Sequence, residues 1–83
     1  MEKIKALRSE IDAIDDTLIP LLIKRFTLSR EIGVLKKQAE IHVLDRQREH
    51  SILQKIPHSP YQESLIELYS LLFTLSKKHQ EMT

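Results

Sequence analysis

The sequence predicts an all-α fold of three helices per chain, long, short and medium in length. Apolar residues recur at spacings of three and four through the first half of the chain, which is the period of an amphipathic helix. Alternation of the strand type is rare, and the 83 residues include only one glycine. At this length we expect one domain over residues 1–83, with a core of limited size.

The first predicted helix covers residues 3–38 and would be about 50 Å long. Its apolar positions form a line, here called the seam, which repeats as in a coiled coil. Two shorter helices of the same chain cannot cover a seam of this length, so about half of it needs another surface. The simplest source is a second copy, which predicts a homodimer with antiparallel long helices. The seam consists of Ile4, Leu7, Ile11, Ile14, Leu18, Leu21, Arg25, Leu28, Ile32 and Leu35.

Pro20 interrupts this helix. A proline inside a helix removes a backbone hydrogen bond and usually bends the axis. One interpretation is therefore a pair of helices, over residues 3–18 and 21–38. Because Leu18 and Leu21 keep the seam in phase and no turn residue accompanies the proline, we predict one kinked helix.

Two further helices follow. Asp45 begins the segment DRQREHSILQKI, predicted as a short helix because a carboxylate suits a helix N-terminus. The segment PHSP then breaks the chain. The third helix is predicted over about residues 60–80, with a buried stripe formed by Leu65, Leu68, Tyr69, Leu72 and Phe73.

Composition excludes several classes of function. A net charge of +1 argues against a nucleic-acid binder with a broad basic face. The chain has no cysteine, so it can form neither a disulfide nor a thiolate metal site. A charged N-terminus and the lack of a long apolar run predict neither a signal peptide nor a membrane span, hence a cytoplasmic protein. The histidines lack metal-ligand spacing and are predicted to be exposed, with no metal bound: His42, His50, His58 and His79.

Polar residues interrupt the inward face of every predicted helix. Arg25 occupies a seam position, and Lys36 lies three turns later on nearly the same face. A buried charge without a partner is costly, so such groups should meet each other or an ionic ligand. The remaining members are Asp45, Arg48 and Glu49 in the short helix and Ser76 and Gln80 in the third.

Each of these residues also has a purely structural interpretation. Arg25 could set the register of a coiled coil, and Lys36 could be a solvated cation near a helix C-terminus. The segment DRQRE could be an exposed run of charges with Asp45 as its cap. Ser76 and Gln80 could be the hydrated end of a helix. Their coincidence on three inward faces favours a binding site.

The chain carries the pattern LRxxIDxIDxxLIxLLxxR…xxxIGxxK…xxDRxRE. This pattern resembles the all-α class of chorismate mutase, and the resemblance runs from Leu7 to Gln80. Pro20 and the short PHSP connection depart from the family pattern. The resemblance implies an interlocked homodimer with two equivalent sites. It assigns the site to Arg8, Arg25, Lys36, Asp45, Arg48, Glu49, Ser76 and Gln80.

The resemblance implies rearrangement of chorismate, a dianion, to prephenate in phenylalanine and tyrosine biosynthesis. This unimolecular reaction needs no cofactor, nucleophile or obligatory proton transfer. Arginines would bind the substrate carboxylates bidentately and hold the reactive chair. Lys36 and Gln80 would donate to the ether oxygen as it gains negative charge. Glu49, with Asp45 nearby, would orient the substrate hydroxyl.

Arg8 lies seventeen residues before Arg25, about 25 Å along the helix axis. Both cannot reach one small molecule from the same helix. An antiparallel partner helix would bring the second copy's Arg8 to this position, so the site is expected to be shared across the dimer.

Two other functions stay open on this reasoning. One is an isochorismate-pyruvate lyase, which has the same fold and a similar site. The other is a helical dimer that binds an aromatic metabolite for regulation, without turnover. The pairing of Glu49 with Gln80 beside a full cationic set favours the mutase.

Overall fold

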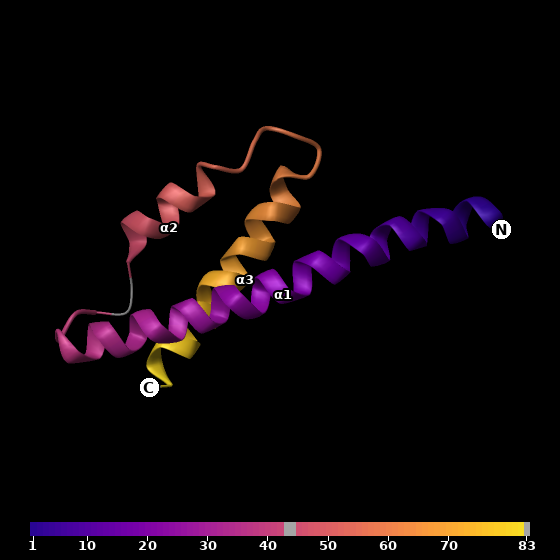
Figure 1. The fold of residues 1–83 in the computed structure, drawn as a ribbon. Helices are drawn as coiled ribbons and strands as arrows, with labels where there is room; N and C mark the ends of the chain where they lie inside the picture. Colours follow the sequence, from indigo (N-terminus) through magenta and orange to yellow (C-terminus); the bar gives the residue numbers. More distant parts are fainter. Residues whose placement is uncertain (43–44, 83) are drawn as a thin grey trace.

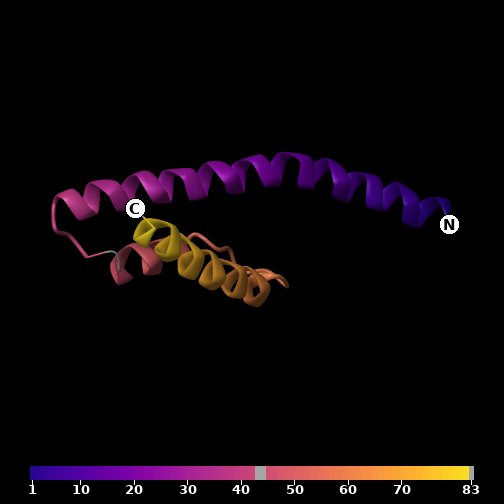
Figure 2. The same cartoon turned by 90° about the horizontal axis from the view of Figure 1, so that it is seen from below.

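The computed structural model describes residues 1–42 and 45–82. Within them the chain forms α1 (Glu2–Gln38), α2 (Arg46–Leu53) and α3 (Gln62–Glu81), with no strand among the described residues. The α1 helix contacts α3, and α3 also contacts α2 (Figure 1). Both shorter helices lie on one side of α1, beside its C-terminal half, while its N-terminal half extends beyond them (Figure 2). The predicted all-α fold of three helices is confirmed.

The α1 helix is continuous through Pro20. Figure 2 shows it as one bowed ribbon, so the prediction of a single helix is confirmed and the division into two is wrong. The helix ends in a Schellman motif: the amide of Ile41 donates to the Lys36 carbonyl, and the amide of Glu40 donates to the Lys37 carbonyl. Glu40 has a positive φ of 58°, the left-handed conformation that this motif requires.

The interior between α1 and α3 is small. The buried residues of α1 are Ser29 and Gly33, so the two helices can approach closely there. Among the described residues, the buried hydrophobic ones are Leu72 and Phe73 of α3. His79, predicted to be exposed, is half-buried instead, because its ring packs against that of Phe26 with centroids 4.9 Å apart. The other three histidines are exposed.

Two further details of the prediction are wrong. The short helix ends at Leu53 and not at Ile56. Pro57 disfavours the α conformation at Ile56, the residue before it. After Leu53 the chain therefore forms turns, in which the amides of Lys55 and Ile56 donate to carbonyls three residues back. In α3, Leu68 is 49% exposed and does not belong to the buried stripe.

The N-terminal half of the seam is uncovered in the single chain. Every residue from 1 to 21 is exposed, and its apolar seam residues range from 42% exposed at Leu18 to 61% at Ile14. Leu22 is the first half-buried residue of α1. The described helices include none that is both long and apolar enough to cross a membrane.

Candidate functional site

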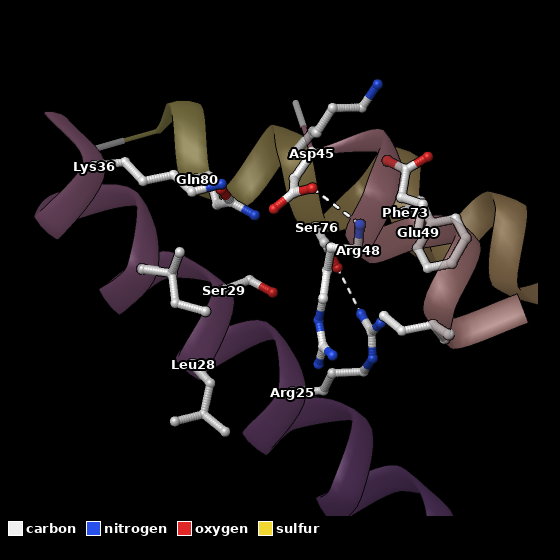
Figure 3. A pocket seen from close by; sticks show the side chains of 13 residues that line it. Arg25, Leu28, Ser29, Lys36, Asp45, Arg48, Glu49, Phe73, Ser76 and Gln80 are labelled. Carbon is white, nitrogen blue, oxygen red and sulfur yellow. Dashed lines mark hydrogen bonds between the residues drawn. The ribbon is translucent and has the colours of Figure 1, made fainter. Parts of the chain in front are cut away.

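A cavity of about 410 Å³ lies among the three helices, within the usual size range of small-molecule sites. Figure 3 shows polar side chains entering it from α1, α2 and α3. The lining residues are Arg25, Leu28, Ser29, Ile32, Lys36, Asp45, Arg48, Glu49, Ile52, Phe73, Ser76, Lys77 and Gln80.

Arg25 is held in place by α3. Its Nη1 atom donates to the Ser76 hydroxyl at 2.6 Å, and its guanidinium lies 5.8 Å from the centre of the Tyr69 ring. The arginine is half-buried and Ser76 is 8% exposed. A guanidinium fixed by a hydrogen bond and a ring face is ordered before any ligand arrives. It still has donors left over, because the side chain carries five N–H groups.

The α2 helix brings a second arginine and two carboxylates to the cavity. The Asp45 side chain accepts from the Arg48 amide at 2.9 Å, so the interpretation of Asp45 as an N-cap is confirmed. Asp45 also lines the cavity. Glu49 lies one turn after the cap and is half-buried. In Figure 3 the guanidinium groups of Arg25 and Arg48 both lie in the space between α1 and α2.

Lys36 and Gln80 lie together at one end of the cavity, away from Arg25 (Figure 3). Both are half-buried, and the Oε1 atom of Gln80 is fully buried. An ammonium and a side-chain amide are both hydrogen-bond donors at neutral pH. This end of the cavity can therefore stabilise negative charge on a ligand atom.

The cavity favours anions. Four basic side chains line it against two acidic ones, and the wall between them is partly apolar. In the described part of the chain, no group of three or more histidine and carboxylate side chains has the geometry to hold a metal ion. The arrangement suits a small organic anion whose carboxylates bind the arginines while its apolar ring contacts residues such as Ile32 and Phe73.

Seven of the eight residues predicted for the site line this one cavity. Arg8 does not: it is exposed on the N-terminal half of α1. The prediction missed Ser29 and Lys77, although their positions relative to predicted site residues could have indicated them. Ser29 follows Arg25 by one turn, and Lys77 adjoins Ser76. Three apolar lining residues were predicted only as seam or core, namely Leu28, Ile32 and Phe73, and Ile52 of α2 is the fourth.

The sequence of this chain is similar to those of known proteins. The sequence pattern of the family described as chorismate mutase type II matches residues 7–81. The chain is similar to the bifunctional chorismate mutase/prephenate dehydratase of Aquifex aeolicus, with 41% identity over 56 residues, which are 68% of this chain and 16% of that protein. It is 43% identical to the T-protein of Haemophilus influenzae over 54 residues, 65% of this chain and 14% of that protein.

A third relative has a similar length. The chorismate mutase of Methanocaldococcus jannaschii is 27% identical over an alignment of 86 positions, gaps included, which covers 98% of this chain and 87% of that protein. The chain thus spans less than a fifth of the first two relatives and most of the third. No solved structure is significantly similar to it. The family match covers nearly all of the chain, and we conclude that the chain belongs to the chorismate mutase type II family.

Proposed function

We propose that this protein converts chorismate to prephenate, an intramolecular rearrangement in aromatic amino-acid biosynthesis. The observation that carries the proposal is the convergence of seven predicted site residues on one cavity with an excess of basic groups. Chorismate is a dianion with an apolar ring, which fits such a lining. The reaction needs no cofactor, because it is a pericyclic shift in which bonds break and form together, without a nucleophile or an obligatory proton transfer.

The arginines would hold the substrate in its reactive shape. Arg25 is already ordered by Ser76 and Tyr69, so little side-chain freedom is lost when it binds a carboxylate. Arg48, which extends into the cavity from α2, would also bind a carboxylate. Fixing both ends of a flexible dianion raises the fraction of molecules in the chair from which the rearrangement proceeds.

Lys36 and Gln80 would stabilise the transition state. As the ether bond breaks, its oxygen gains negative charge, and the two donors at that end of the cavity would strengthen their hydrogen bonds to it. Glu49 would accept a hydrogen bond from the substrate hydroxyl, with Asp45 nearby. These side chains orient and polarise the substrate, and none needs to exchange a proton with it.

The proposal includes an interlocked antiparallel homodimer in which Arg8 of the second copy completes each cavity. The uncovered seam supports it, because residues 1–21 expose apolar side chains along the helix that carries Arg8. We further propose that residues 1–83 act as a single mutase domain. We also propose a cytoplasmic location.

The test is incubation of purified protein with chorismate and, separately, with isochorismate, with the products separated by chromatography. We expect prephenate from chorismate in wild type, a loss of roughly a hundredfold or more in Arg25→Met, and full activity in Arg30→Met. Arg30 is exposed on the same helix and does not line the cavity, so it controls for removal of a cation. Formation of salicylate from isochorismate, with no prephenate formed from chorismate, would indicate the lyase. Saturable binding of chorismate without turnover would indicate a regulatory module.

A further inference from the structure

Gly33, the single glycine of the sequence, lies inside α1 where its backbone conformation does not require a glycine. The described residues include no glycine with a positive φ. Inside a helix, glycine is less favourable than alanine because it loses more backbone freedom on folding. The reason for a glycine at this position must therefore be the space around it.

That space is occupied by the backbone of α3. A Cβ atom built on Gly33 would lie 2.5 Å from the Cα atom of Gln80 and 2.8 Å from its carbonyl carbon, with the carbonyl oxygen closer still. Real Cβ contacts are essentially never this short. A backbone cannot rotate away as the end of a side chain can, so any larger residue at 33 must displace α3 at Gln80.

Gln80 is also a residue of the cavity, and the glycine contact lies at its own backbone. Lys36 lines the same end of the cavity, three residues after Gly33 on α1. The close approach of α3 to Gly33 thus helps to set the distance between the two proposed donors, Lys36 and Gln80. Neither the family match nor the site prediction gives Gly33 a role.

We propose that Gly33 is a positioning residue: by having no side chain, it lets the Gln80 backbone sit against α1 at the depth that aims the Gln80 amide at the breaking ether bond. This inference rests on the proposed mutase function. Displacing Gln80 by roughly 1 Å would misplace a donor whose benefit depends on geometry, and such a displacement can cost about a hundredfold in rate.

The rival explanation is that Gly33 serves only close packing and stability. A double-mutant cycle separates the two, using wild type, Gly33→Ala, Gln80→Ala and the double variant. If Gly33 acts through Gln80, Gly33→Ala should lower kcat and kcat/KM together by roughly a hundredfold. Once the Gln80 amide has been removed, the same substitution should change kcat by less than about threefold.

Leu72→Ala is the stability control. Leu72 is buried in α3 but does not line the cavity, so this variant should lower the melting temperature and leave kcat within about twofold while folded. If Gly33→Ala does not give the helical circular dichroism of wild type, the cycle is repeated with Thr27→Ala and Thr74→Ala added. Both threonines are exposed in helices and outside the cavity, and alanine is the better helix former.

The outcomes are distinct. An equal loss from Gly33→Ala with and without Gln80 would overturn the positioning role and leave the mutase function standing. So would a Gly33→Ala protein that stays unfolded in the stabilised background, because the glycine would then be a requirement of folding. Wild type without turnover of chorismate would overturn the proposed function, and this role of Gly33 with it.

Discussion

The two halves of α1 have the same apolar period but different surroundings. Residues 22–38 pack against α3 and contribute Arg25 and Lys36 to the cavity. Residues 2–21 include the part of α1 that extends beyond both shorter helices (Figure 2), and they expose their whole apolar seam. The period of a helix therefore indicates that a face needs a partner, without indicating whether that partner is the same chain, a second copy or a ligand.

Interrupting residues distinguish these cases. In the C-terminal half the seam contains Arg25, and the buried positions beside it are Ser29 and Gly33, which are small. In the N-terminal half the seam is entirely leucine and isoleucine. Covering such a side chain contributes on the order of 1–2 kcal/mol, so the six together rival the stability of a small domain. This half is suited to another apolar helix, and the C-terminal half to an anion.

The largest effect should come from a charge in the uncovered half. Ile14→Asp would place a carboxylate in the proposed dimer interface. We expect the free energy of unfolding to fall by roughly 3 kcal/mol or more per chain, with dissociation of the dimer and loss of helix. Sedimentation and circular dichroism measure both. Ser9→Asp is the control, since Ser9 lies on the opposite side of the helix from Ile14. A folded monomer of Ile14→Asp with wild-type stability would show that the exposed seam needs no partner.

Beside the C-terminal half of α1, a disruptive substitution should lower the rate of the reaction and leave the dimer assembled. Gln80→Glu replaces a donor by a carboxylate that repels the developing charge when ionised and donates again when protonated. We expect about a hundredfold less activity at neutral pH and recovery as the pH falls, while wild type changes little between about pH 5 and 8.

The measurement for Gln80→Glu is the pH-rate profile, with circular dichroism at each pH. Gln47→Glu adds the same charge at an exposed position of α2 outside the cavity and should follow the wild-type profile. Parallel profiles for Gln80→Glu and wild type would mean that Gln80 does not face the breaking bond.

Asp45 combines a structural and a proposed binding role, and two variants separate them. Asn caps a helix about as well as Asp, whereas alanine does not, so Asp45→Ala should lose about 1 kcal/mol of stability and Asp45→Asn much less. If the carboxylate also helps to orient the substrate, both variants should lose activity by roughly tenfold. Wild-type kinetics in Asp45→Asn would leave Asp45 with the capping role alone.

The smallest effect is expected where α1 ends. Glu40→Gly should raise the free energy of unfolding by up to about 1 kcal/mol, because glycine adopts the left-handed conformation without a steric penalty. Activity should not change, since Glu40 does not line the cavity. Chemical denaturation at a fixed protein concentration measures the gain, and a loss of stability would mean that the Glu40 side chain has a favourable contact in the assembled protein.

Most of this architecture could be predicted from the sequence, because its determinants are local. Because the seam keeps its phase across Pro20, it predicted one helix, and the carboxylate of Asp45 predicted the start of α2. The residues that were missed depend on tertiary contacts. His79 is half-buried because Phe26 lies opposite it, and Gly33 matters because Gln80 crosses it. Neither distance can be obtained from helical periodicity, since both depend on how α3 approaches α1.

We propose that the uncovered half of α1 lies on a second copy and gives it Arg8. Mixing Arg8→Ala chains with Arg25→Ala chains tests this directly, because each variant alone should be nearly inactive. A heterodimer would contain one intact site and one doubly damaged site, so random exchange should restore about a quarter of wild-type activity. Exchange demonstrated by native mass spectrometry, without any recovery of turnover, would contradict the shared site.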